Sequence, residues 1–213
     1  MSDASSRPVV PQAGAARPGG RTAAVRRSVL VATEDALIEH GFAGIDLSSL
    51  ARAAGVGKTT IYRRWGTPQC VVADLLDDMA ARSVTATRTG DLDADLRANA
   101  ELVVRTLTHP RQGRLFAALI AASTHDRDTK AALAEFFRRR VEEWSLPIID
   151  AIERGEVPPN TDPIAVVRHL SAPLYYQFLT MTTPLDDLAA DRAARATVAA
   201  MRAQCFAKSD AAS

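Results

Sequence analysis

The chain has 213 residues, of which 24% are charged and 47% hydrophobic, and its net charge is +1. This length fits one large domain or two small ones. The chain has no apolar run of 18 residues and no signal-peptide core, so we expect no membrane span and no secretory leader. The two cysteines lie far apart and predict a reduced, cytoplasmic protein without a disulfide, and the spacing of the four histidines fits no metal site.

The charge is unevenly placed along the chain. Residues 1–65 contain nine Lys or Arg and five Asp or Glu, whereas residues 66–213 contain 17 and 20. A basic end on a mildly acidic body is typical of a protein that touches nucleic acid with one end only. A protein that coats DNA or RNA would be basic throughout.

The first 40 residues divide into a tail and a helix. Residues 1–20 are rich in Ala, Pro, Gly, Ser and Arg, which predicts a disordered arm. Its arginines could enter a minor groove, and a solvated tail is the alternative. An apolar face that includes Val29 and Leu37 then predicts a helix over about 22–40.

Residues 47–65 have the pattern of a helix-turn-helix, two short helices joined by a glycine turn. Leu47 and Leu50 share one face of the first helix, and Gly55 suits its end because glycine adopts a left-handed conformation without a Cβ penalty. Ile61 and Trp65 lie four residues apart in the second helix, so we expect both to face the core.

The remaining side chains of the second helix are polar and are expected to contact DNA: Lys58, Thr59, Thr60, Tyr62, Arg63 and Arg64. Such side chains reach base edges and phosphates when this helix enters the major groove. Gly57-Lys58-Thr59 also resembles the end of a phosphate-binding loop. Arg52, however, stands where that motif needs its first glycine, and a helix precedes it instead of a strand.

The segment 21–68 resembles the DNA-binding domain of TetR-family transcriptional repressors. His40-Gly41-Phe42 matches the end of that family's first helix, and Leu50-ARAAGVGKTTIYRR-Trp65 matches its IAxxAGVSKxTxYxxF core. Three later stretches are similar to the C-terminal domain of one subfamily: Glu135-FFRRRVEEW, Ala151-IERGE and Pro173-LYY. The resemblance implies about nine helices, and a double-stranded, palindromic DNA operator bound by a homodimer.

Three positions depart from the family pattern. Asp46 stands where threonine or serine is frequent, Gly57 replaces a serine, and Pro68 replaces a phosphate-binding lysine. Phosphate contacts are therefore expected to be fewer than is usual in the family, although the helix N-terminus after Thr67 could still face a phosphate. The expected contacts to the DNA backbone are Arg26, Arg27 and Thr67.

The rest of the chain also has helical periodicity and no sustained strand alternation. Helices are predicted over about 68–87, 92–108, 111–123, 126–154 with a kink at Pro147, 163–181 and 185–207. The expected fold is all-α, with a helix-turn-helix domain over 21–67 and a helical regulatory and dimerisation domain over 68–213.

Apolar stripes on the last two helices predict a dimer interface in a four-helix bundle, with packing inside the monomer as the alternative. The stripe residues are Val166, Leu170, Leu174, Phe178, Val198, Met201 and Cys205. An effector pocket is expected among the helices between 92 and 181, although core packing is the alternative for each candidate. The candidate lining residues are Phe116, His125, Phe137, Trp144, His169, Tyr175 and Tyr176.

These features predict a sequence-specific DNA-binding transcriptional regulator, a repressor released from its operator by a small-molecule effector. Two alternatives stay open. One is a DNA-binding activator or nucleoid protein without small-molecule input. The other is an all-α enzyme, although no GxSxG, HExxH or paired-cysteine motif supports it. No catalytic residue, cofactor or metal ligand is predicted.

Overall fold

The computed structural model describes residues 18–208, and this part of the chain is helical. No β-strand occurs within it, and Thr161 and Ala207 form an isolated bridge. The elements are α1 (Pro18–His40), the 3₁₀ helix η1 (Phe42–Gly44), α2 (Leu47–Ala53), α3 (Lys58–Arg64), α4 (Pro68–Ala81), α5 (Leu92–Thr108), α6 (Pro110–Ser123), α7 (Arg127–Trp144), α8 (Leu146–Glu153), α9 (Pro163–Thr180) and α10 (Asp187–Arg202). The expected all-α fold is confirmed.

Several helix boundaries differ from the prediction. α1 begins at Pro18, and proline suits the first helical turn; of the predicted arm, residues 1–17 lie outside the described part. α4 ends at Ala81 and not near 87, ahead of residues 83–87, whose hydroxyl and β-branched side chains disfavour helix. α10 ends at Arg202 and not near 207.

The helix predicted over 126–154 is two helices, α7 and α8, which meet at Ser145. Pro147 follows this point and lacks the N–H that a continuous helix would use. This division accounts for ten described α-helices where about nine were expected. No helix within residues 18–208 combines the length and the hydropathy that crossing a bilayer requires.

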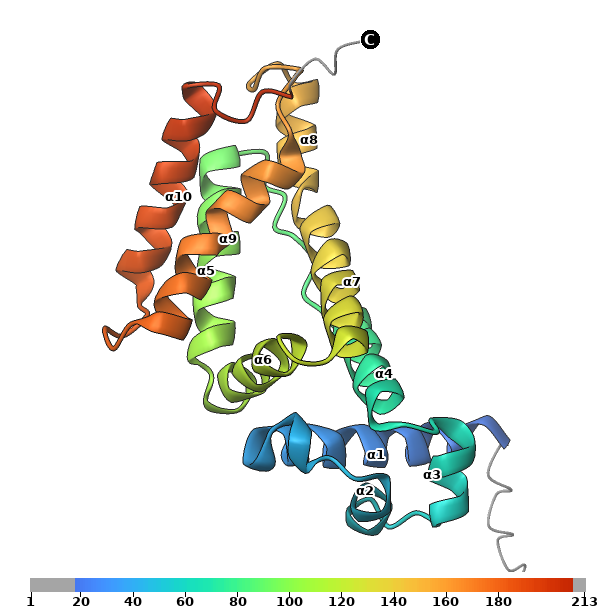
Figure 1. Ribbon diagram of the computed structural model, residues 1–213. Coiled ribbons are helices and arrows are strands. Elements are labelled where there is room, and N and C mark those ends of the chain that lie inside the picture. Colours follow the sequence, from blue (N-terminus) through green and yellow to red (C-terminus); the bar gives the residue numbers. More distant parts are fainter. Residues whose placement is uncertain (1–17, 209–213) are drawn as a thin grey trace, which may run out of the picture.

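The helices form a small unit and a larger one (Figure 1). α1, α2 and α3 make the small unit at one end, where α1 packs on α2 and α3 follows the turn. Its core contains Val29, Leu37, Leu50 and Ile61, each at most 2% exposed. This packing presents α3 at the extremity of the molecule.

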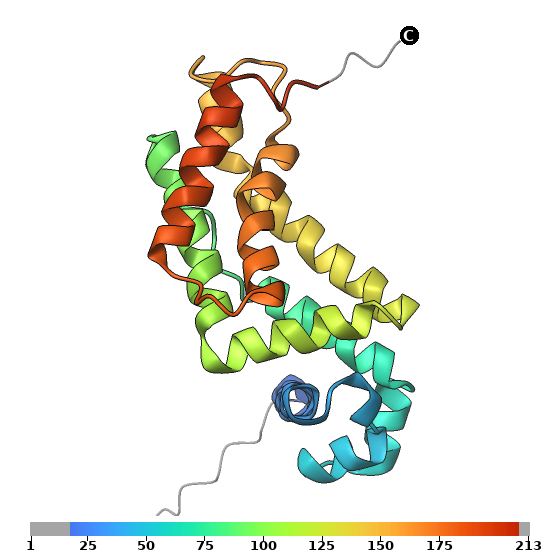
Figure 2. The same cartoon turned by 60° about the vertical axis from the view of Figure 1, so that its left-hand side comes forward.

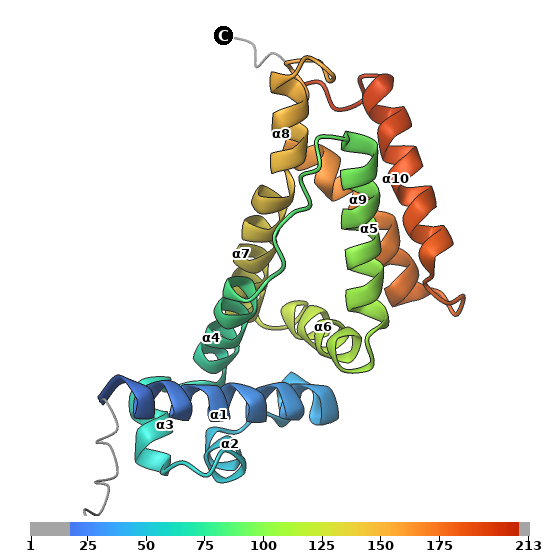
Figure 3. The ribbon, with the colours of Figure 1, turned by 180° about the vertical axis from the view of Figure 1, so that it is seen from behind.

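The larger unit begins with α4, which leaves the small unit and packs against α7. α5, α9 and α10 lie side by side, as Figures 1 and 2 show. α6 joins α5 to α7 and rests on α1, and Figure 3 shows this contact from behind. The two units therefore touch at α1–α4 and α1–α6.

Candidate functional site

Local hydrogen bonds shape the turn between α2 and α3. The Asp46 carboxylate caps α2 by accepting a hydrogen bond from the Ser49 N–H at 2.8 Å, and this bond lowers the pKa of Asp46. Gly55 has a φ of +67°, in the left-handed region that ends a helix. α3 then begins at Lys58, and its N-cap, Gly57, has no side chain to contribute.

One face of α3 packs on the small unit. Ile61 is fully buried and Trp65 is 7% exposed, as their spacing predicted. This burial fixes the rotation of the helix and turns its polar side chains outward. Of the six residues predicted to contact DNA, Lys58, Thr59, Tyr62, Arg63 and Arg64 are exposed, and Thr60 is partly buried.

Two of these outward side chains contact neighbours. The Tyr62 hydroxyl lies 3.3 Å from the Ser48 hydroxyl on α2. The Arg64 guanidinium lies 4.9 Å from the centroid of the Trp65 ring, a cation–π distance. Both contacts restrict the side chains, so Lys58, Thr59 and Arg63 are the ones that project with the fewest restraints.

The expected backbone contacts are only partly available. Arg26 was expected to contact the DNA backbone, but its guanidinium faces α4. There Nη2 lies 2.8 Å from Asp74, and Nη1 lies 2.6 Å from Asp78. Those two carboxylates neutralise it, so it is committed to fastening α1 to α4. Arg27 is exposed on α1, and the hydroxyl of Thr67 caps α4.

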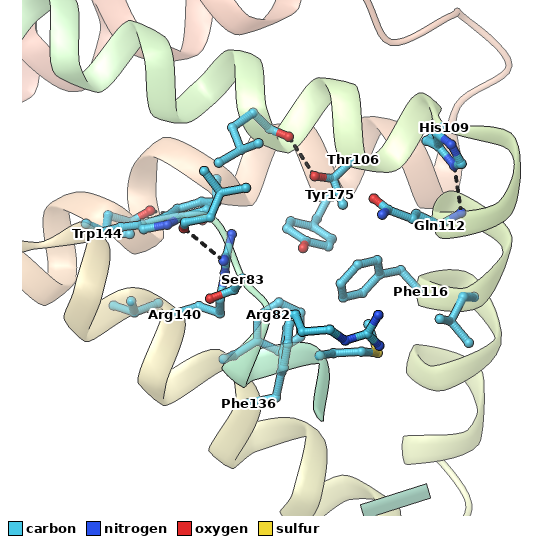
Figure 4. A pocket seen from close by; sticks show the side chains of 18 of the residues that line it. Arg82, Ser83, Thr106, His109, Gln112, Phe116, Phe136, Arg140, Trp144 and Tyr175 are labelled. Carbon is cyan, nitrogen blue, oxygen red and sulfur yellow. Dashed lines mark hydrogen bonds between the residues drawn. The ribbon is translucent and has the colours of Figure 1, made fainter. Parts of the chain in front are cut away.

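A cavity of about 380 Å³ lies within the larger unit and reaches α1. Figure 4 shows side chains from several helices around it. Four of the predicted lining residues are there: Phe116, Phe137, Trp144 and Tyr175. The Phe137 ring contacts the Tyr175 ring edge-on, with centroids 5.6 Å apart. Burial raises the pKa of Tyr175 to about 12.

The other three residues that were predicted to line the cavity lie elsewhere. His169, Tyr176 and His125 do not line this cavity, and all three are exposed. His169 and Tyr176 lie on the outer side of α9, the side opposite Leu170 and Leu174 of its buried stripe. Aromatic character alone therefore did not separate the two faces of this helix.

Polar residues of the cavity were missed by the sequence reasoning. They include Glu34, Arg82, Thr106, His109, Arg111, Gln112 and Arg140. One of them had a signal in the sequence. Arg140 lies seven residues after Leu133 and four before Trp144, both buried, so it occupies an apolar-stripe position of α7.

An ion-pair network connects the cavity with α1. Glu34 lies 2.9 Å from Arg111 of α6 and 3.8 Å from Arg82 at the end of α4, and Arg111 also lies 2.6 Å from Asp35. Glu34, Arg82 and Arg111 all line the cavity. These ion pairs link residues that line the cavity to α1, which packs on α2 of the helix-turn-helix.

The apolar stripe that was predicted to form the dimer interface is instead buried within the subunit. Val166, Leu170 and Leu174 of α9 are at most 1% exposed within the subunit, and Val198 and Met201 of α10 at most 9%. These side chains pack inside the subunit, the alternative named above, because α9 and α10 lean on each other and on α5. Phe178 is partly buried, and Cys205 is exposed beyond the end of α10.

A different set of apolar residues faces outward on and between these helices. Tyr176 is 59% exposed and Leu179 46% exposed on α9, Met181 follows at 49%, and Leu188 on α10 is 71% exposed. Large apolar side chains that are exposed in neighbouring segments make a candidate protein contact.

Two family models match the chain. The model described as bacterial regulatory proteins of the tetR family matches residues 29–68, which include α2 and α3. The model described as a tetracyclin repressor-like C-terminal domain matches residues 86–197, which include most of the larger unit.

Individual relatives agree with these matches. The transcriptional regulator AqdR of Rhodococcus erythropolis is 31% identical over 150 residues, which cover 69% of this chain and 70% of AqdR. The DNA-binding transcriptional repressor TetR of Mycobacteroides abscessus is 29% identical and covers 75% of this chain and 84% of its own. The crystal structure of the TetR-family regulator SCO0332 superposes with a TM-score of 0.63 at 27% identity, and covers 80% of this chain and 94% of its own.

Proposed function

Because the chain belongs to the TetR family of DNA-binding transcriptional regulators, we propose that it is a repressor whose homodimer leaves a palindromic operator when a small molecule enters the cavity. The proposal is carried by the orientation of α3. Its apolar residue Ile61 is buried, while its cationic side chains and the Thr59 and Tyr62 hydroxyl groups are on the exposed side at the end of the molecule. The relative from Mycobacteroides abscessus, described as a repressor, supports the sign of regulation.

On this proposal, residues 21–67 bind DNA and residues 68–213 form the regulatory and dimerisation domain. Lys58, Thr59, Thr60 and Arg63 read base edges in the major groove, and Tyr62, Arg64, Arg27 and the N-terminus of α4 at Thr67 contact phosphates. Because chromosomal DNA is the partner, we place the protein in the cytoplasm.

Dimerisation follows from the way the operator is read. A single α3 reaches only a few base pairs, whereas two subunits reading half-sites about 34–36 Å apart recognise a palindrome. We propose that the outward apolar residues of α9 and α10, from Tyr176 to Leu188, hold the subunits together. This surface replaces the buried stripe that the sequence predicted.

The release mechanism uses the Glu34 network. A ligand among Phe116, Phe137 and Tyr175 would displace Arg82 or Arg111, and each of these arginines pairs with Glu34 of α1. A shift of α1 and α4 changes the separation of the two recognition helices. The ligand must therefore bind the DNA-free arrangement more tightly than the DNA-bound one.

A regulator without small-molecule input is the second candidate, and the cavity disfavours it. A space of about 380 Å³ lined by polar and aromatic groups has the size and lining of a small-molecule site, which a regulator without such input does not need.

Selection of genomic fragments by the purified protein tests the proposal. We expect enrichment of a palindromic sequence, bound far more tightly than random DNA, and loss of that enrichment in a Lys58→Ala/Arg63→Ala double variant. Arg154→Ala is the matched control, because Arg154 lies beyond α8 and pairs with Glu156. Equal affinity for all fragments would refute specific operator binding.

A further inference from the structure

Arg140 of α7 is partly buried without an ion-pair partner among the described residues, which is unusual for a cation. Within residues 18–208, every arginine is exposed except Arg26 and Arg140. Arg26 satisfies its charge with Asp74 and Asp78. Arg140 has no carboxylate within ion-pair distance in the described part of the chain, and burial lowers its pKa.

The contacts that Arg140 does make leave most of its hydrogen-bonding capacity unused. Its Nη1 donates to the Val84 carbonyl oxygen at 3.3 Å, and its guanidinium lies 4.2 Å from the centroid of the Trp144 ring. The nearby Glu143 carboxylate instead accepts a bond from the Ala86 N–H at 3.4 Å. A guanidinium has five N–H donors, and a partly buried one without a counterion is costly.

Two further donors line the same cavity. The Trp144 Nε1–H is buried and has no hydrogen-bond acceptor among the described residues. The Tyr175 hydroxyl stays protonated, because burial raises its pKa to about 12 against the smaller lowering by Arg140. In Figure 4, Arg140, Trp144 and Tyr175 approach the cavity from α7 and α9. This part of the wall offers donors and a positive charge.

The other charges of the cavity are already paired. Arg111 contacts Glu34 and Asp35, and Arg82 contacts Asp78 at 2.7 Å. The rest of the wall is mostly apolar and includes Met79, Leu115, Phe116, Phe137, Val141 and Val167. A ligand that complements both regions needs an apolar body and one anionic group.

We infer that the effector is an organic anion, a carboxylate or sulfonate attached to an apolar ring system. Its charged group binds the Arg140 guanidinium and the Trp144 N–H, and its rings pack against Phe116 and Phe137. A planar guanidinium donates two parallel hydrogen bonds to such a group, which fixes its orientation. The inference rests on the proposed effector role of the cavity.

A pair of fluorescent probes that differ by one charged group tests the inference. 1-Anilinonaphthalene-8-sulfonate carries a sulfonate, and N-phenyl-1-naphthylamine has the same ring system without it. Both are titrated into the full chain without DNA. We expect Arg140→Gln to weaken binding of the sulfonate about tenfold to a hundredfold and binding of the neutral probe less than about threefold.

Two more variants make the result specific. Arg139→Gln is the matched control: Arg139 is exposed and pairs with Glu135 and Asp77, so neither probe should respond. Trp144→Phe keeps a ring beneath Arg140 but removes the N–H, and it should weaken only the sulfonate. Because Arg140 lacks a counterion, its replacement should leave the free energy of unfolding unchanged or raise it, which thermal unfolding measures.

The inference is overturned if Arg140→Gln weakens both probes equally, if it weakens neither, or if Arg139→Gln has the same effect. If Arg140→Gln does not fold, Trp144→Phe decides. The inference is then overturned if Trp144→Phe weakens binding of both probes equally or weakens binding of neither. Probe binding without DNA is independent of operator selection. A negative result with the probes therefore does not argue against DNA binding. A failure to select an operator likewise does not argue against the anion site.

Discussion

Asp74 joins three helical segments through one carboxylate. It accepts hydrogen bonds from Arg26 on α1, at 2.9 Å and 2.8 Å, and from the Trp65 Nε1–H at the end of α3, at 2.9 Å. Burial by itself raises the pKa of Asp74, but the bonds from Arg26 and Trp65 outweigh it and the net pKa is lowered. The carboxylate therefore fastens the recognition helix to α4.

Arg26→Ala should release this attachment. We expect the free energy of unfolding at pH 7 to fall by about 1–3 kcal/mol, because a partly buried charge loses its main partner. The folded-state pKa of Asp74 lies below its reference value of 3.8, so the stabilisation is present above that value and is lost as the pH falls through the lower one. Urea unfolding of wild type and variant should therefore converge in acid. Arg27→Ala, an exposed neighbour, should change little.

Arg63 should set specificity as well as affinity. Its side chain is exposed on the outer face of α3, so Arg63→Ala is expected to cost about 1–3 kcal/mol on the selected operator and to relax preference at one symmetric base pair. Fluorescence anisotropy with operator and random DNA measures both effects. Equal weakening on the two DNAs would reduce Arg63 to a phosphate contact.

At the scale of elements, α9 and α10 each bury an apolar face inside the subunit, and each also has at least one large apolar side chain that is exposed. Leu170 and Leu174 are buried against neighbouring helices, whereas Tyr176 and Leu188 are exposed. A charge on the inner face would bury an unpaired carboxylate at a cost of several kcal/mol and would unfold the subunit. For the proposed dimer, only a change at an exposed apolar position separates dimerisation from folding.

Leu188→Asp is therefore the informative variant. Because Leu188 is 71% exposed, we expect the subunit to fold with little loss of stability, while the dimer dissociates and operator affinity falls by more than in any single α3 variant. Sedimentation velocity at micromolar concentration measures the assembly. Ile149→Asp places the same charge on an exposed position of α8 and should leave the dimer intact. A Leu188→Asp dimer would show that the subunits meet elsewhere.

At the scale of the whole molecule, α1 contacts both α4 and α6 of the larger unit. Glu34 pairs with Arg111 and Arg82, both lining residues of the cavity, and Arg114 of α6 donates to the Ile38 carbonyl oxygen at 3.0 Å. These contacts lie on the face of α1 that meets α4 and α6. On the proposed mechanism, coupling between DNA and effector crosses this surface or the Asp74–Trp65 contact at the end of α3.

Glu34→Gln should weaken that coupling. Linkage is reciprocal, so saturating operator should lower the affinity of wild type for 1-anilinonaphthalene-8-sulfonate by about fivefold or more. We expect this factor to approach one in Glu34→Gln and to persist in Glu39→Gln, an exposed position of the same helix. Fluorescence titrations with and without operator give both factors. An unchanged factor in Glu34→Gln would place the coupling outside this network.

The sequence by itself determined the features that depend on neighbours along the chain. The turn at Gly55 and the burial of Ile61 and Trp65 follow from residue type and spacing. Local signals of this kind were sufficient for the all-α fold and for the outward face of α3. Aromatic character selected four residues that line the cavity and three that do not.

Only the tertiary structure decided what covers the apolar face of each late helix. The stripe from Val166 to Leu174 reads equally well as a core face or as an interface, because periodicity records that a face is apolar and not what covers it. Arg26 likewise looks like a phosphate contact until α4 brings Asp74 to it across 48 positions of sequence. Arg140 became visible as a binding group only when the fold enclosed its charge without supplying a carboxylate, since counterions are matched in space and not along the chain.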